Sequence, residues 1–143
     1  MRYSAGFFAA MLPLLPFHAF LSASHWLYMF GHAGLMHYAL NGLGWLFLWR
    51  IITPWRTLAA WLVSVGVSFI VPSDHPVIGW SVVIYYYLGL CLSSMDRQSR
   101  NRFLLLTLVG FFLPHIAAAH HAAMLAIGFL MRKLEVRWER TLR

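Results

Sequence analysis

The chain has 143 residues, of which 61% are hydrophobic and only 10% are charged. Soluble domains average about 25% charged residues, so the composition argues against an ordinary soluble protein and predicts that a lipid bilayer is the solvent. A formal net charge of +7 is compatible with nucleic-acid binding, but the placement of the charges gives another explanation below. The single cysteine, Cys91, excludes an intrachain disulfide.

Apolar runs along the chain predict one all-α domain over residues 1–143, a polytopic membrane protein with a bundle of six transmembrane helices. Such spans must be helical, because a helix satisfies its own backbone groups without a closed barrel. Several runs are shorter than the roughly 20 residues that cross a bilayer, which predicts extended helix ends or a locally thinned bilayer. The runs lie at 5–23, 35–49, 57–71, 77–95, 103–113 and 116–131, and a basic tail follows at 132–143.

The basic residues decide between five and six spans. Six spans, with a tight turn near Pro114 and His115, place all 11 Lys and Arg residues on one side. The positive-inside rule makes that side cytoplasmic, so both termini are expected there, in a bacterial inner (cytoplasmic) membrane. A single span over 103–131 kinked at Pro114, or a signal peptide cleaved from residues 1–24, would leave five spans. The six-span arrangement explains the positive charge without a nucleic-acid partner.

Polar side chains inside apolar runs are functional candidates, because they are costly in hydrocarbon. His37 and Asn41 are four residues apart and share one helix face. An amide and a neutral imidazole each offer a donor, so the pair could hold a developing oxyanion. The alternative is a hydrogen bond that joins two helices of the bundle.

A serine begins the fourth run in the segment Gly79-Trp80-Ser81. Gly79 permits a sharp turn into a helix, and free backbone N–H groups at a helix N-terminus favour the negative charge that a nucleophile generates. Tyr85 follows Ser81 by four residues, on the same face. The alternative for Ser81 is an ordinary helix cap.

Two adjacent histidines, His120 and His121, lie near the start of the last run. A histidine within reach of a serine can take its proton and return it later. Asp74 is the only acid on the predicted outer side, so a Ser–His dyad is expected rather than a triad. The alternative for each histidine is a hydrogen-bonded core residue.

The ordered set of motifs resembles the rhomboid family of intramembrane serine proteases. HAGLMHYALN (32–41) is similar to the second-span motif, GWSVVIYYYLGL (79–90) to the nucleophile motif and HAAMLAIGFL (121–130) to the last-span motif. The resemblance implies a six-helix core, with site residues in stated roles. These are Ser81 as nucleophile, His121 as general base and acid, His37, Asn41 and the Ser81 N–H as oxyanion donors, Tyr85 packing on His121, and His32 lining a water-accessible cavity.

The sequence also departs from the family's pattern. Val82 and Met124 stand where the family usually has small residues that let the fourth and sixth spans approach closely. A wider or shifted contact is therefore expected, and His120, with Ala123 three residues later, is the alternative base. The loop at 22–34, between the first two predicted spans, is shorter than in the family, and it reads Trp26-Leu27 where the family often has Trp-Arg. The fifth run, at 103–113, is also short.

The resulting expectation is an intramembrane serine endopeptidase that cleaves transmembrane segments of other membrane proteins. Its active site would open to the outer face, its partners would be these substrates and the lipid bilayer, and it would need no cofactor and no metal. Oligomeric state is left open. One alternative is a catalytically inactive rhomboid-like module that binds membrane proteins. Another, prompted by eight histidines, is a metal or haem protein.

Overall fold

The structure is a computed structural model that describes residues 6–7, 9–17, 20–21, 23–73, 77–112 and 117–141. These residues form helices joined by turns, with no strand among them, as the predicted all-α class requires. Asp74 and the predicted turn at Pro114 and His115 lie outside the described residues, as do several residues of the first predicted span.

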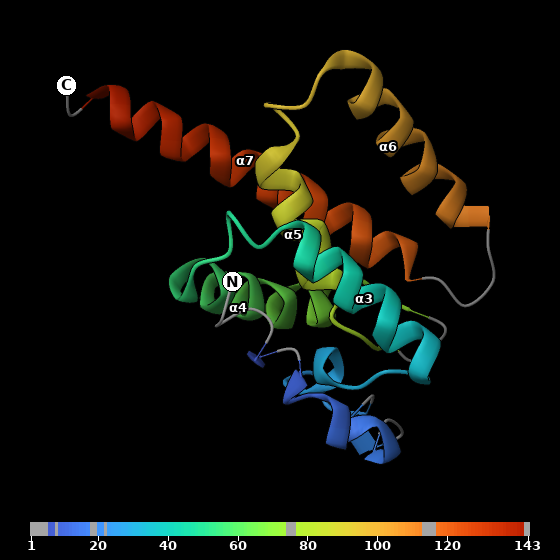
Figure 1. The fold of residues 1–143 in the computed structure, drawn as a ribbon. Coiled ribbons are helices and arrows are strands. Elements are labelled where there is room, and N and C mark those ends of the chain that lie inside the picture. Colours follow the sequence, from blue (N-terminus) through green and yellow to red (C-terminus); the bar gives the residue numbers. More distant parts are fainter. Residues whose placement is uncertain are drawn as a thin grey trace.

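Figure 1 shows the arrangement of the helices. Local sequence fixes the start of α4. Pro54 is its first residue, and the Thr53 side chain caps it by accepting a hydrogen bond from the Arg56 backbone N–H at 3.3 Å. In order, the elements are η1 (Leu12–Phe17), η2 (Tyr28–Phe30), α3 (Leu35–Phe47), α4 (Pro54–Ile70), α5 (Ser81–Cys91), α6 (Arg97–Val109), η3 (Gly110–Phe112) and α7 (Ala118–Thr141).

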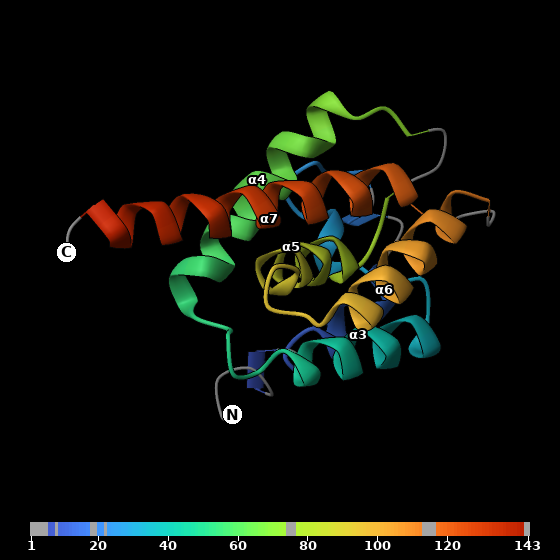
Figure 2. The same ribbon diagram turned by 90° about the horizontal axis from the view of Figure 1, so that it is seen from above.

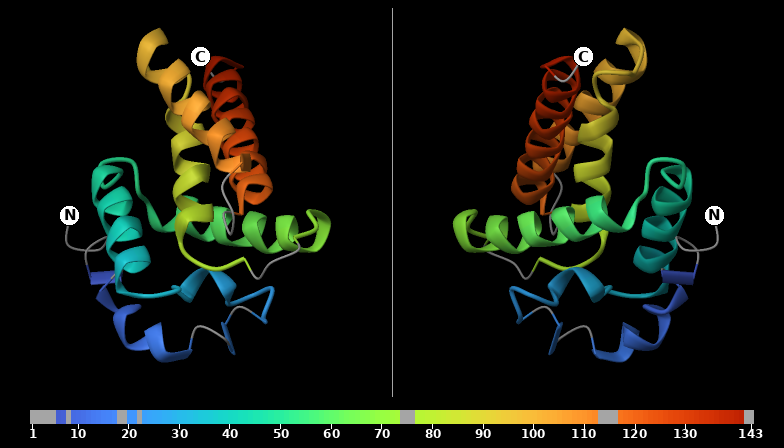
Figure 3. Two further views of the ribbon diagram at one scale, coloured as in Figure 1. Left: turned by 90° about the vertical axis from the view of Figure 1, so that its right-hand side faces the viewer. Right: turned by 90° about the vertical axis from the view of Figure 1, so that its left-hand side faces the viewer.

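The centre of the fold is α5. It contacts α7 most extensively and also touches α3 and α4, and Figure 2 shows it nearly end-on between α7 and α3. The helix itself carries apolar residues on all of its sides, which is typical of a helix buried in a core. Val82, Val83 and Tyr87 are fully buried within it. Side views show α6 and α7 rising beside α5, while α4 crosses below (Figure 3).

The prediction of six membrane spans, and with it that of an integral membrane protein, is wrong for the part of the chain that the structure describes. None of the described helices combines the length and the apolar character needed to cross a bilayer. Two of them, α3 and α5, have 13 and 11 residues, fewer than the roughly 20 that a span needs. The first turns of α6 are RQSRNR, and the second half of α7 is strongly charged.

Two glycines set the distance between α5 and α7. A methyl group added at Gly89 would overlap the carbonyl oxygen of Leu125, and one added at Gly128 would overlap that of Tyr86. In both cases the obstacle is backbone, so it could yield only if the helices moved apart. The glycines therefore permit a backbone-to-backbone contact that any side chain would prevent.

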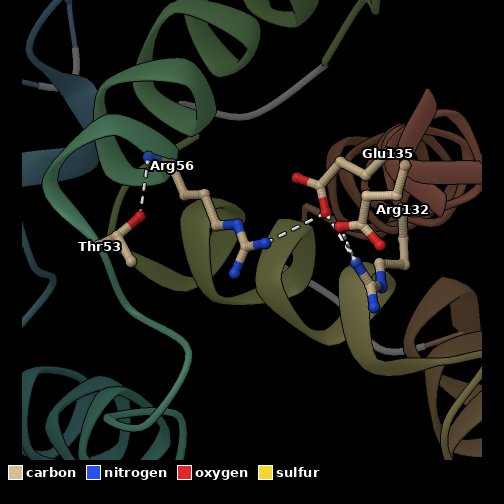
Figure 4. A network of polar contacts seen from close by, with 5 residues as sticks. Thr53, Arg56, Arg132 and Glu135 are labelled. Carbon is tan, nitrogen blue, oxygen red and sulfur yellow. Dashed lines mark hydrogen bonds and ion pairs between the residues drawn. The ribbon is translucent and has the colours of Figure 1, made fainter. Parts of the chain in front are cut away.

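An ion-pair network joins the start of α4 to the charged half of α7 (Figure 4). The Glu135 carboxylate accepts hydrogen bonds from Arg56 and from Arg132, each at 3.1 Å. These side chains remain about one-third exposed, so the network contributes at most about 1 kcal/mol per pair. It fixes where α4 and α7 meet more than it stabilises the fold.

Candidate active site

The α5–α7 contact places a serine hydroxyl against a histidine ring. Ser81 Oγ lies 2.9 Å from His121 Nε2, within hydrogen-bonding distance. Ser81 is the first residue of α5, and His121 lies in the first turn of α7. The close approach at Gly89 and Gly128 brings the two helices together along the faces that carry this pair. A hydroxyl and an imidazole at this distance can exchange a proton.

Gly79 shapes the turn that leads into α5. Its φ of +108° belongs to a region that side-chain-bearing residues rarely adopt. A Cβ at this position would also collide with the His37 ring and reach the Asn41 amide. The glycine therefore serves two purposes, because it makes the turn and leaves room for two side chains of α3 beside it.

The His37 ring has a defined tautomer. The Ala33 backbone N–H donates to His37 Nδ1 at 3.3 Å, so Nδ1 is an acceptor. Burial lowers the pKa of His37, which favours the neutral ring. In a neutral ring with Nδ1 unprotonated, the proton sits on Nε2, which lies against Gly79. His37 thus presents a donor towards the turn that precedes Ser81.

The Asn41 amide is buried beside this donor. Asn41 is only 4% exposed, and its Nδ2 donates to the His37 carbonyl oxygen at 3.0 Å within α3. This bond uses one of the two amide hydrogens and directs the group towards Gly79. The backbone N–H of Ser81, at the start of α5, has no acceptor within its own helix. Three hydrogen-bond donors, on His37, Asn41 and Ser81, therefore lie near the N-terminus of α5.

Tyr85 supports the histidine from the other side. Its ring stacks on the His121 ring, with centroids 4.2 Å apart and planes within 3°. Burial raises the pKa of Tyr85, so the phenol stays protonated. The side chain of Thr107 on α6 interacts with the Tyr85 hydroxyl and favours a lower pKa. Thr107 thus links α6 to the position of the His121 ring, a connection that the sequence motifs did not indicate.

The two other histidines of the predicted site occupy separate positions. His120 is buried and lines a cavity of about 320 Å³ with Tyr28 and Ser68. Adjacent residues point about 100° apart on a helix, which explains why His121 and not His120 meets Ser81. His32 is 1% exposed and packs edge-on against the His37 and Tyr38 rings. It therefore buttresses His37 from within the core.

A second serine–histidine contact provides a useful contrast. His25 Nδ1 lies 2.9 Å from Ser68 Oγ, at an exposed position. The Ser68 hydroxyl donates its one hydrogen to the Val65 carbonyl oxygen at 2.7 Å. It must then accept from His25, so this histidine cannot act as its base. Only the Ser81–His121 contact has the arrangement that proton abstraction requires, among the described residues.

Val82 and Met124 occupy the positions where the sequence predicted a widened contact. Both are fully buried, yet Ser81 and His121 remain 2.9 Å apart. The helices achieve this through Gly89, which lies eight residues after Ser81 on the same face and meets Gly128. The backbone contact between α5 and α7 therefore lies at Gly89 and Gly128. The spacing Ser81, Tyr85, Gly89 was the sequence signal for it.

Comparisons of the chain with protein-family models, with curated proteins and with solved structures found no match. The resemblance to the rhomboid proteases therefore depends on the three sequence motifs.

Acidification should destabilise the fold, because two histidines are held neutral inside it. Burial lowers the pKa of both His32 and His121 from 6.5 to about 4. Between these values the unfolded chain binds protons that the folded chain excludes, so stability is greatest above pH 6.5 and falls as the pH drops towards 4. Urea unfolding midpoints measured across this window should decrease steadily. A constant or rising midpoint would contradict the burial of these rings in neutral form.

Loss of the Thr107 hydroxyl should weaken the positioning of His121. In Thr107→Val, the Tyr85 hydroxyl loses its partner, which is worth about 1 kcal/mol, or about fivefold in kcat. Thr107→Ser retains a hydroxyl and should restore most of the rate. Combining Thr107→Val with Tyr85→Phe should cost no more than either change alone, since both remove one bond. Additive losses in steady-state kinetics would show that Thr107 acts elsewhere.

Proposed function

We propose that the chain is a rhomboid-type serine endopeptidase. The observation that carries the proposal is the 2.9 Å contact between Ser81 Oγ and His121 Nε2, with the Tyr85 ring stacked on the histidine. Burial lowers the pKa of His121 to about 4, and nearby His120 and His37 act in the same direction. The ring is therefore neutral at neutral pH and able to accept a proton.

The proposed reaction has two stages. His121 Nε2 takes the proton of the Ser81 hydroxyl as Ser81 Oγ attacks a peptide carbonyl carbon, and His121 then returns the proton to the leaving amine. Water, activated by the same nitrogen, releases the acyl group from Ser81. His37 Nε2–H, the Asn41 amide and the Ser81 backbone N–H would stabilise the oxyanion of each stage. The resemblance implies that the cleaved bond lies in or near a transmembrane segment of another protein.

A fluorophosphonate probe tests the nucleophile directly. The purified chain should gain one covalent adduct, which peptide mass spectrometry locates on Ser81, and Ser81→Ala should remain unlabelled. Ser68→Ala is the matched control, because it removes the serine of the other Ser–His contact and should label like the wild type. Equal labelling of wild type and Ser81→Ala would remove Ser81 from the role.

The two other functions considered from the sequence receive less support. The inactive binding module was prompted by Val82 and Met124, but both residues are buried without separating Ser81 from His121. A site for a metal ion bound by the protein alone needs clustered ligands. Within the described parts of the chain, no group of 3 or more His, Cys, Asp or Glu residues is placed to hold a metal ion.

A further inference from the structure

The charged half of α7 forms one wall of a cavity, far along the helix from His121. In Figures 1 and 2 this end of α7 extends beyond the other helices. The cavity has a volume of about 510 Å³, and Ser93, in the turn after α5, lines it together with residues of α7. Its lining residues are Ser93, Arg132, Lys133, Val136, Arg137 and Arg140.

The helical spacing explains why cations gather here. Arg132 and Arg140 are eight residues apart, and Lys133 and Arg137 are four apart, so the two pairs form adjacent stripes on one side of α7. Like charges four residues apart, such as Lys133 and Arg137, repel one another and weaken the helix. A bound anion would relieve this repulsion.

The nearby carboxylates do not neutralise this cluster. Glu135 is shared between Arg132 and Arg56, which reaches it from α4 (Figure 4). Glu139 lies 3.9 Å from Arg132 as well. Both acids are thus directed to Arg132, the cation at one end of the cavity.

The other three cations, Lys133, Arg137 and Arg140, are placed where they could bind an anion. Lys133 Nζ lies 4.5 Å from the centroid of the Phe129 ring, a contact that orients the side chain without removing its charge. Arg137 and Arg140 are exposed. Guanidinium groups match the oxygens of a phosphate through paired hydrogen bonds.

We propose that this cavity is a binding site for a phosphate group, held by Lys133, Arg137 and Arg140. An anion site explains why these three cations line one cavity. The phosphate could belong to a soluble polyphosphate or to a lipid headgroup, which share the recognised chemistry. The proposal does not depend on the peptidase activity.

The test uses the full chain at low ionic strength, since exposed charges are screened by salt. One arm titrates inorganic pyrophosphate by calorimetry. The other measures co-sedimentation with phosphatidylcholine vesicles, with and without phosphatidylglycerol. Arg137→Gln combined with Arg140→Gln should weaken the binding by about tenfold or more. The charge-matched control combines Arg50→Gln with Arg102→Gln, residues that do not line the cavity.

Each outcome has a definite meaning. Saturable pyrophosphate binding that only the cavity variant loses supports the site and a soluble ligand. Binding confined to vesicles with phosphatidylglycerol, again lost only in the cavity variant, supports the site and a lipid headgroup. Equal loss in both variants would show that net charge alone attracts the anions, and absence of binding in both arms would likewise overturn the proposal.

Discussion

Replacing either member of the dyad should almost abolish peptide hydrolysis. Ser81→Ala and His121→Ala should each lower kcat by about four orders of magnitude or more, because a nucleophile and its base act as one unit. For the same reason the double variant should be no slower than the slower single variant. The proposed oxyanion donors on α3 and α5 remain in all three proteins, so a small residual rate above the uncatalysed reaction should persist.

The neighbouring histidine provides the control. His120→Ala changes the same helix turn and also removes a buried imidazole, but Ser81 Oγ contacts His121. We expect this variant to keep most of its kcat if its fold, checked by circular dichroism, is intact. If His120→Ala lost as much kcat as His121→Ala, with both proteins folded, the assignment of the proton transfer to His121 would be wrong. Multiplicative losses in the double variant would show that Ser81 and His121 act independently.

The parts of the site that could be predicted are those encoded by helical spacing. Ser81 and Tyr85 share a face because they are four residues apart, and His121 meets that face in the structure. The turn at Gly79 was also foreseeable, since glycine suits its positive φ. The tautomer of His37 was not, because the Ala33 N–H that fixes it is positioned by the loop. Thr107 was missed because it reaches the site from another helix through Tyr85.

The spans could not be predicted from composition because apolar runs do not show where helices begin and end. The run at 77–95 contains a turn at Gly79 and yields only the 11 residues of α5. The run at 103–113 belongs to a helix whose first turns are polar. The last run continues without a break into the basic tail, so that α7 is long but half charged. In each case the backbone turns or the charged residues at the ends of the run, and not the hydropathy of its middle, determine where the helix begins and ends and how apolar it is.

The largest effect on stability should come from the α5–α7 contact. Gly89→Ala and Gly128→Ala should each lower the free energy of unfolding by about 3 kcal/mol or more, because the added methyl group meets backbone that cannot rotate away. The helices would have to separate, which would also lengthen the Ser81–His121 contact. Urea unfolding should therefore show a lower midpoint, and fluorophosphonate labelling should fall in parallel.

Two other helical glycines show whether steric overlap is the cause. Gly66 in α4 has no neighbouring atom within 4 Å of an added Cβ, so Gly66→Ala should stabilise the protein by about 0.5–1 kcal/mol through the unfolded chain. At Gly44 the obstacle is the Ile84 side chain at 3.2 Å, which can change its rotamer, so Gly44→Ala should fall between these extremes. The order Gly66, Gly44, Gly89 follows from what each methyl group meets. If Gly89→Ala were as stable as Gly66→Ala, the backbone contact that brings Ser81 to His121 would not exist.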